Sequence, residues 1–269
     1  MEIINNNYSE LFEACRSGDI EVVEEILKKS VININVIDPD VGDTPLIFAV
    51  RNGHLNVVKR ILQHPHVDVN APGTRGLTPL MWSIFCLGSI DNEDYGQYFD
   101  IFTTLMEVPL LQLVRSCILG ATVLHYACHG NLVYILKLLC NDSRCNPAFV
   151  NKKDNLGDTA LMKAVWKGHL DIVKELDIEG TDYNTKNKYG TTLIETARMR
   201  NKDKVLEYLI QRPNVDTLMI ICAQNMCRYL TSIDDLESLQ IPLTIKEYTH
   251  AIHNKNDNAH SSCWFSAIS

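Results

Sequence analysis

The sequence predicts an all-α repeat fold of about six helix pairs joined by short hairpin turns. A Gly-x-Thr triplet recurs every 33 to 44 residues, with its glycines at Gly42, Gly76, Gly120, Gly157 and Gly190. A short apolar run follows each triplet, and the segment after it carries apolar pairs three to four residues apart, the spacing of one helical face. A single helix pair cannot bury its apolar face alone, so neighbouring pairs are expected to stack and share a continuous core.

The first helix of each pair is expected in the apolar run after the triplet. These runs are TPLIFAV, TPLMWSI, TVLHYAC, TALMKAV and TTLIETA. An earlier unit, LFEACRSGDIEVVEEIL at residues 11–27, has the same two helices without the triplet and is predicted to be a terminal capping repeat. Segments such as VDVNAPG and TDYNTKN separate the pairs, and their Asn, Gly and Pro residues favour turns.

The second helices are expected around four sets of apolar residues. These are Val57, Val58, Ile61 and Leu62; Ile101, Phe102, Leu105 and Met106; Tyr134, Ile135, Leu138 and Leu139; and Val205, Leu206, Leu209 and Ile210. The third unit has about ten extra residues, Ser89–Tyr98, which predict a surface loop at 89–98. The fourth unit is interpreted as one residue short before Gly130. In the fifth unit, Asp177 replaces an apolar residue and predicts a weakly packed outer helix.

Two of these units carry a family resemblance. TPLIFAVRNGHLNVVKRIL followed by VDVNA resembles an ankyrin repeat over its full length, and DTALMKAVWKGHLDIVKEL resembles one nearly as well. The resemblance extends over residues 5–212 in six units. It implies an ankyrin solenoid domain over residues 1–212 whose role is to bind another protein.

A different pattern follows Pro213, which cannot continue a helix. In TLMIICAQNMCRYLTSIDDLESLQIPLTIKEYT, the residues Leu218, Cys222 and Met226 fall in line on one helical face. This segment, residues 213–249, resembles a SOCS box, and ankyrin repeats followed by such a box are the organisation of the ankyrin-repeat and SOCS-box family. The resemblance implies that Leu218, Cys222 and Met226 bind elongin B/C. It also implies a cullin-binding half, formed by Leu239, Ile241 and Pro242.

Two departures and one alternative accompany the box. Gln240 stands where family members often carry a proline, which leaves the choice of cullin open, and Ala223 stands where a basic residue is common. Alternatively, these helices only cap the last apolar face of the solenoid, since every solenoid end must be covered. The remaining tail, residues 250–269, is polar and without period, and is expected to be flexible.

Charge and composition narrow the possible partners and locations. Lys and Arg number 25 against 33 Asp and Glu, a net charge of −8, so the chain lacks the basic footprint of nucleic-acid or anionic-membrane binding. No apolar run suits a signal peptide or a membrane span. The nine cysteines are an odd number, and most lie in apolar helical patterns, which favours reduced thiols over disulfides. A cytoplasmic location is expected, with the nucleus as an alternative.

The candidate target-binding residues are aromatic. One position of the first helix lies between the apolar residue of the run and the small residue that follows it. In three consecutive units this position holds an aromatic residue, and exposed aromatic residues in a groove are typical anchors of protein binding. The inserted acidic loop adds two tyrosines. For the aromatic residues of the helices, the alternative is that they only pack between repeats. For the inserted loop, the alternative is that it has no function. The candidates are Phe48, Trp82, Tyr126, Trp166, Tyr95 and Tyr98.

Catalysis and metal binding are not predicted. His125 resembles the histidine of the ankyrin consensus, which joins turns by hydrogen bonding, and Cys128 and His129 lack a second Cys/His pair at zinc-ligand spacing. No cofactor is expected. The predicted function is that of a non-catalytic substrate-recognition adaptor, which joins a target protein to elongin B/C, a cullin and its RING subunit in a ubiquitin ligase. The alternative is a plain ankyrin scaffold or inhibitor.

Overall fold

The computed structural model describes residues 2–28, 32–89, 94–178 and 180–211 of the chain. Within these ranges the regular structure is helical, with one isolated β-bridge between Lys153 and Thr159. None of the helices described is long and apolar enough to cross a membrane. The predicted all-helical repeat fold is therefore confirmed for the described part of the chain. The proposed box at 213–249 and the tail at 250–269 lie outside the described residues.

The helices occur in six pairs. The first, or inner, helices are α1 (Glu2–Ser17), α3 (Pro45–Arg51), α5 (Pro79–Leu87), α7 (Val123–His129), α10 (Ala160–Lys167) and α12 (Leu193–Met199). The second, or outer, helices are α2 (Ile20–Lys28), α4 (Leu55–Leu62), α6 (Tyr95–Met106), α8 (Val133–Asn141), α11 (Leu170–Glu175) and α13 (Asp203–Ile210). Two short elements, the 3-10 turn η1 (Thr74–Gly76) and α9 (Pro147–Val150), lie in the connections.

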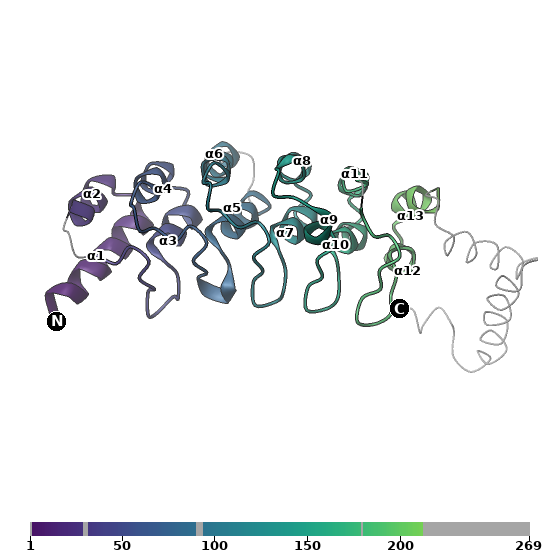
Figure 1. The fold of residues 1–269 in the computed structure, drawn as a ribbon, viewed down its shortest axis with the longest axis horizontal. Coiled ribbons are helices and arrows are strands. Elements are labelled where there is room, and N and C mark those ends of the chain that lie inside the picture. Colours follow the sequence, from purple (N-terminus) through teal and green to yellow (C-terminus); the bar gives the residue numbers. More distant parts are fainter. Residues whose placement is uncertain (1, 29–31, 90–93, 179, 212–269) are drawn as a thin grey trace, which may run out of the picture. The chain divides into compact units, whose positions relative to one another are not determined.

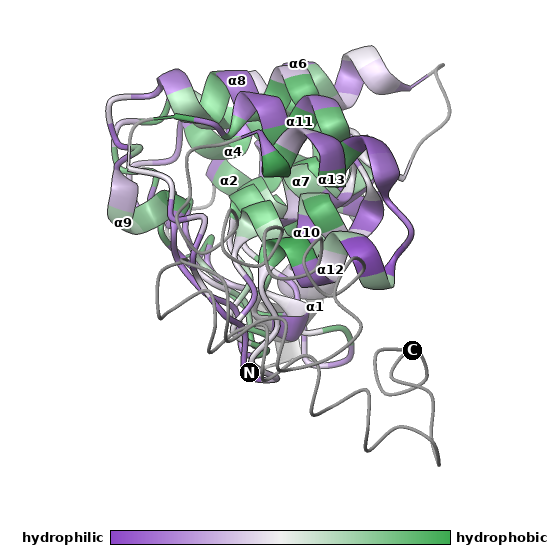
Figure 2. Ribbon diagram, turned by 90° about the vertical axis from the view of Figure 1, so that its right-hand side faces the viewer, coloured by the Kyte–Doolittle hydropathy of each residue, from purple (hydrophilic) through white to green (hydrophobic). Residues whose placement is uncertain are grey.

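The chain forms two compact units. Among the described residues, unit 1 lies within 2–164 and 171–181, and unit 2 comprises residues 165–170 and 182–211. In unit 1 the inner helices pack in sequence, α1 against α3, α3 against α5 and α5 against α7, while α4 packs between α2 and α6 in the outer layer (Figure 1). Hydrophobic residues lie on the sides of α4, α6 and α7 that face between the layers (Figure 2), and this arrangement buries the core.

The structure explains the recurrent Gly-x-Thr triplet. Its glycine ends each hairpin with a left-handed backbone, from φ +71° at Gly76 to φ +84° at Gly42, which a residue with a side chain adopts at a cost. Its threonine is the N-cap of the inner helix: the Thr44 hydroxyl accepts a hydrogen bond from the amide of Ile47, and the Thr78 hydroxyl does the same for Met81. The triplet is therefore a turn-and-cap signal, which is why it marks the repeats.

The fourth repeat corrects one prediction from the sequence. Its outer helix α8 begins at Val133, eleven residues after Thr122, and α4 begins at Leu55, also eleven residues after its own threonine Thr44. No residue is missing, so the predicted deletion before Gly130 is wrong. Asn131, at φ +57°, takes the left-handed turn position that Gly53 and Gly168 occupy in the second and fifth repeats.

This register also changes the buried face of α8. Its buried residues are Ile135, Leu136 and Leu139, while Tyr134, which was expected in the core, is 56% exposed. The predicted core positions in α6 agree with the structure, because its buried residues are Ile101, Phe102 and Leu105.

The third repeat corrects the predicted loop at residues 89–98. Helix α6 begins at Tyr95, so Tyr95 and Tyr98 are helical residues. The Tyr98 hydroxyl donates to the backbone carbonyl of Arg51 at 2.8 Å, and the Tyr95 ring stacks parallel to that of Phe99. Both tyrosines therefore pack onto the repeats, and deletion of residues 89–98 would remove the first turn of a helix.

Candidate protein-binding surface

The three aromatic residues predicted to line a groove do occupy equivalent places on α3, α5 and α7, but they differ in burial. Phe48 is 3% exposed, and its ring packs 5.6 Å from that of Phe12 in the preceding repeat, with the Arg16 guanidinium 4.9 Å above it. Trp82 and Tyr126 are partly exposed. Phe48 therefore serves packing between repeats, whereas Trp82 and Tyr126 reach the surface.

Trp82 and Tyr126 belong to a continuous run of rings. The Arg51 guanidinium lies 4.4 Å from the centre of the Trp82 ring, a cation–π contact between repeats. Phe85 meets Trp82 edge to face at 5.6 Å and Tyr126 edge to face at 6.5 Å. Because Phe85 is 46% exposed, it forms the open centre of this run. We call Trp82, Phe85 and Tyr126 the aromatic run.

The indole nitrogen of Trp82 is buried and has no hydrogen-bond acceptor. An unsatisfied buried donor costs free energy, and the stacked Arg51 cation adds no acceptor. Trp82 is therefore held by ring packing rather than by hydrogen bonding.

Tyr126 connects the aromatic run to a hairpin. Its hydroxyl donates to the Cys117 Sγ atom at 3.5 Å, and Cys117 begins the hairpin that precedes α7. Burial raises the pKa of Tyr126 well above its usual value, and the hydrogen bond to Cys117 acts in the same direction, so the phenol stays protonated.

The hairpin tips beside the aromatic run carry exposed side chains that are mostly aliphatic. The Ile118 amide donates to the Arg75 carbonyl at 3.1 Å, and the Asn155 amide donates to the Leu119 carbonyl at 2.8 Å, so three consecutive tips lie side by side. Among their exposed residues are Arg75 and the aliphatic residues Ile118, Leu119 and Leu156, and we call these four the tip row. The hydrogen bond from Tyr126 to the buried Cys117 joins the aromatic run to the hairpin of Ile118 and Leu119 in unit 1, and we take the aromatic run and the tip row together as the candidate surface.

Two clusters of charged residues hold the backbone of the hairpins that carry the tip row. The buried Asp43 carboxylate accepts from the amide of Thr74 at 2.8 Å and pairs with the Arg51 guanidinium. In the fifth repeat the Lys163 ammonium lies 2.8 Å from the Asp154 carboxylate and 2.7 Å from that of Asp158. Burial alone would raise the pKa of Asp154, but its hydrogen bonds, led by that from Lys163, hold that pKa below its usual value.

His125 has a structural role, as the sequence predicted. Its Nε2 donates to the Asp158 carbonyl at 3.0 Å, and its Nδ1 accepts from the Thr122 amide at 3.1 Å. Burial lowers the pKa of His125 and keeps the ring neutral. In the described part of the chain no group of three or more His, Cys, Asp or Glu is placed to hold a metal ion. The six cysteines described are free thiols, and burial raises the pKa of the nearby Cys128 well above its usual value.

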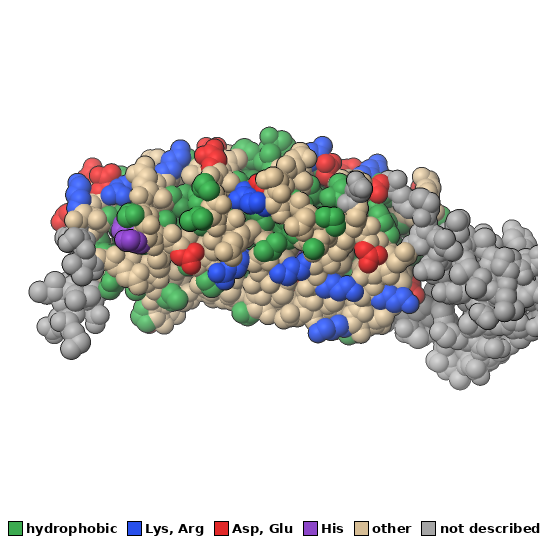
Figure 3. Space-filling view, in the orientation of Figure 1, with side chains coloured by type: hydrophobic (Ala, Val, Ile, Leu, Met, Phe, Trp, Pro, Cys, Tyr) green, Lys and Arg blue, Asp and Glu red, His purple; other side chains and the backbone are tan. Residues whose placement is uncertain are grey.

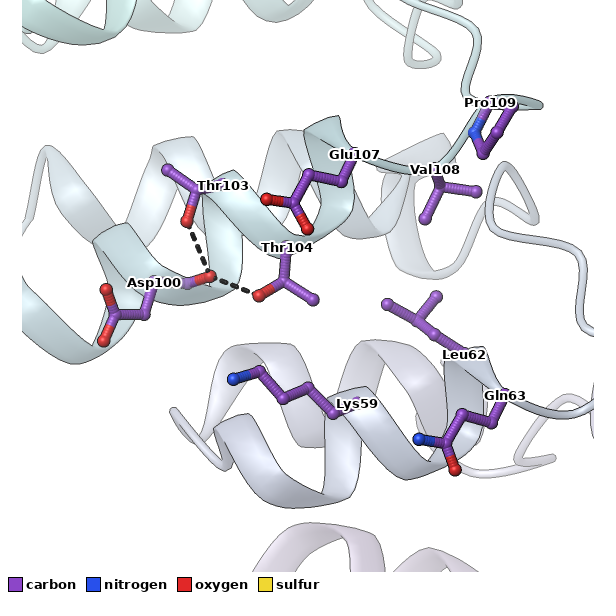
Figure 4. Close-up of a pocket in the computed structure, with 9 residues that line it drawn as sticks. All are labelled: Lys59, Leu62, Gln63, Asp100, Thr103, Thr104, Glu107, Val108 and Pro109. Carbon is purple, nitrogen blue, oxygen red and sulfur yellow. Dashed lines mark hydrogen bonds between the residues drawn. The ribbon is translucent and has the colours of Figure 1, made fainter.

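An open groove lies on the opposite layer, between α4 and α6. It has a volume of about 710 Å³, and Lys59 and Leu62 of α4 face Glu107 and Val108 at the end of α6 across it (Figure 4). The Thr103 and Thr104 hydroxyls on its wall are already satisfied by the Asp100 carbonyl. Acidic, basic and hydrophobic side chains are mixed over these outer helices (Figure 3). The groove has charges of both signs and no catalytic constellation.

Trp166, the remaining predicted contact, belongs to unit 2. It is exposed, with the Arg200 guanidinium 4.2 Å and the Lys167 ammonium 5.2 Å from its ring centre. The elongin-binding candidates Leu218, Cys222 and Met226, and the cullin-binding candidates Leu239, Ile241 and Pro242, lie outside the described residues.

Sequence reasoning missed Phe85 and the tip row. Phe85 stands seven residues after its capping threonine, which is the position of Trp166 in the fifth repeat, so aligning the two would have found it. The tip row carries no comparable signal, because nothing in the segment SCILGAT separates exposed from buried apolar residues, and the exposure of Ile118 and Leu119 follows only from the hairpin geometry.

The chain is similar to known ankyrin-repeat proteins over most of its described length. The family model described as ankyrin repeats in three copies matches residues 11–106 and 93–187. The ankyrin repeat-containing protein C6C3.08 of Schizosaccharomyces pombe is 30% identical over 172 residues, which are 63% of this chain and 68% of the relative.

A longer relative and a solved structure are also similar to this chain. The ankyrin repeat and KH domain-containing protein mask-1 of Caenorhabditis elegans is 26% identical over 251 residues, 90% of this chain but 9% of the relative, so the chain spans only a small part of that protein. An ankyrin repeat domain from Acinetobacter baumannii aligns with a TM-score of 0.61 at 25% identity, covering 74% of this chain and 95% of the domain.

Proposed function

The chain belongs to the ankyrin repeat family, whose role is protein–protein interaction, and we propose that it holds its partner on the aromatic run and tip row of unit 1. The exposed Phe85 ring between Trp82 and Tyr126 supports this proposal most directly. Contiguous exposed apolar surface marks interaction sites, and aromatic anchors dominate binding energy at such sites. The chain contributes recognition rather than chemistry.

Replacement of Phe85 by alanine tests this surface. A partner identified by crosslinking to the full chain is titrated against the wild type and the variant, and Phe85→Ala is expected to weaken binding by about 2 kcal/mol, roughly thirtyfold. Tyr134→Ala is the matched control, because Tyr134 is a similarly exposed aromatic residue on the outer helix α8. Equal losses in both variants, or none in Phe85→Ala, would contradict the proposed surface.

We further propose that the chain is a substrate-recognition adaptor of an elongin B/C–cullin–RING ubiquitin ligase. The support comes from the amino-acid sequence. Directly after the repeats come Leu218, Cys222 and Met226 at helical spacing, and the run from Leu239 to Pro242 completes the resemblance to a SOCS box. An adaptor of this kind raises the effective concentration of target lysines near the charged conjugating enzyme. The alternative is an ankyrin scaffold or inhibitor whose C-terminal segment only caps the repeats.

Leu218→Asp separates the adaptor from the plain scaffold. Burying a leucine is worth about 1.5–3 kcal/mol, and an unpaired charge in an apolar pocket costs more, so elongin B/C affinity should fall at least a hundredfold. In the adaptor the melting temperature of the repeats should stay unchanged. In the capping alternative the melting temperature falls instead, and the wild type forms no complex with purified elongin B/C.

A further inference from the structure

We propose that Arg75 makes this surface selective for a partner segment in which an acidic residue is flanked by apolar residues. This inference rests on the proposed function of the aromatic run and tip row, and it adds the chemistry of the segment that binds there. Three observations carry it: the lack of an ion pair at Arg75, its apolar surroundings and its backbone conformation.

Arg75 differs from Arg51 and Lys163, two cations of the inner helices that are paired with carboxylates. Arg51 is neutralised by Asp43, and Lys163 by Asp154 and Asp158. Within the described residues no carboxylate lies within ion-pair distance of the exposed Arg75. Its charge is therefore available to a carboxylate that comes from a partner.

The surroundings of Arg75 are apolar. Its carbonyl accepts from the amide of Ile118, and the neighbouring Gly76 lies against the Ile118 side chain. Its positive charge also reaches the Tyr126 hydroxyl, whose pKa it acts to lower against the larger, opposite effect of burial. A carboxylate that approaches Arg75 must therefore lie beside the aromatic run and the tip row. Apolar side chains on either side of that carboxylate would cover Ile118 and Phe85.

The backbone of Arg75 is held in a conformation that arginine rarely adopts. Its φ of +60° and ψ of +17° are left-handed, and the next residue, Gly76, is left-handed as well. Hydrogen bonds on both sides, from Thr74 to Asp43 and from Ile118 to Arg75, hold the turn. A glycine would fit this turn without strain, so the arginine side chain is present at a conformational cost, which is typical of functional positions.

A library of random dodecapeptides displayed on phage, selected against the full chain, tests the inference. The wild type should enrich peptides that carry Asp or Glu next to aliphatic or aromatic residues. For a synthetic peptide of the enriched sequence, Arg75→Glu should lower the affinity at least tenfold. Replacing the acidic residue of that peptide by Lys should restore binding to Arg75→Glu and abolish binding to the wild type.

Arg115→Glu is the matched control, because Arg115 is an exposed arginine in the same connection as Ile118 and the charge change is identical. It should change the affinity less than twofold. Enriched peptides that need Phe85 but show no acidic preference would overturn the role of Arg75 and leave the proposed surface standing. If the wild type enriches no peptide whose binding depends on Phe85, the surface itself is wrong, and the role of Arg75 falls with it.

Discussion

The hairpins of the third and fifth repeats occupy the same place in their repeats but are stabilised differently. The fifth is complete by itself: the Asp154 carboxylate accepts from the amides of Leu156 and Asp158, at 2.8 and 2.9 Å, within its own turn. The third has Gly73 at the position of Asp154, so its turn lacks that carboxylate. The buried Asp43 of the preceding hairpin instead accepts from Thr74, at a different position of the turn.

Gly73 and Asp43 depend on each other. A Cβ atom at Gly73 would collide with the Asp43 carboxylate and with the Ile47 side chain, so this glycine makes room for its neighbour's acceptor. In the fifth repeat Lys163 forms ion pairs with two carboxylates, whereas in the third repeat Arg75 forms no ion pair within the described residues. One hairpin is thus completed locally, and the other depends on its neighbour and keeps a charge for recognition.

Asp43→Ala is expected to have the largest effect. It removes the acceptor of the Thr74 amide and leaves Arg51 without its partner, which should lower the free energy of unfolding by about 3 kcal/mol. This is the low end for a buried ion pair, because Arg51 is partly solvated. Urea denaturation measures the loss, and Asp40→Ala, an exposed residue of the same hairpin, should cost less than about 0.5 kcal/mol. Similar losses in both would mean that Asp43 does not support the third hairpin.

Asp154→Ala should cost less, about 2 kcal/mol, because Lys163 keeps Asp158 as a partner. The pKa of Asp154 is lowered in the folded chain, so its contribution is present above the usual carboxylate pKa and is lost as the pH falls through the lowered value. Wild type and variant should therefore differ at pH 7 and converge in acid, once the pH has fallen through the lowered pKa of Asp154, in thermal denaturation. A difference that persists in acid would show that the charge of Asp154 is not what stabilises the turn.

Arg75→Gly is expected to stabilise the fold while it weakens binding. Relief of the left-handed arginine should raise the free energy of unfolding by about 1 kcal/mol, and the selected acidic peptide should bind at least tenfold more weakly. Asn131→Gly is the control, since asparagine tolerates the same conformation and should gain less than half as much. A loss of stability in Arg75→Gly would show that the side chain itself supports the third hairpin.

Protonation of His125 should have the smallest effect, up to about 1 kcal/mol. Burial lowers its pKa in the folded chain, so the unfolded chain takes up a proton first as the pH falls below about 6.5. Stability should therefore decline as the pH falls below about 6.5, and less steeply in His125→Gln. His64→Gln is the control, because the pKa of His64 is also lowered and its contribution to the pH dependence must be separated from that of His125. An unchanged slope in His125→Gln would mean that the link from the fourth repeat to the fifth hairpin is not proton-sensitive.

The sequence by itself determined the order of helix pairs, because the signals that start them are local. A glycine with positive φ followed two residues later by a capping threonine is a short-range pattern, and the apolar spacing of the outer helices follows from helical geometry. For the same reason the repeat alone placed Phe48, Trp82 and Tyr126 at one equivalent position of the inner helix, although it did not separate the buried Phe48 from the other two. The misplaced core of α8 shows the limit, since Asn131 adopts a conformation that was assigned to glycine.

Only the tertiary structure decided which of the equivalent positions in different repeats are exposed to solvent. Phe48 and Trp82 stand at the same point of the repeat, yet Phe48 is covered by Phe12 and Arg16 of the preceding repeat, while Trp82 continues into the exposed Phe85. Likewise, Asp43 of the preceding hairpin pairs with Arg51 and accepts from the amide of Thr74, whereas no carboxylate of the described residues pairs with Arg75. Burial and charge pairing are set by neighbouring repeats, so a pattern read within one repeat does not contain them.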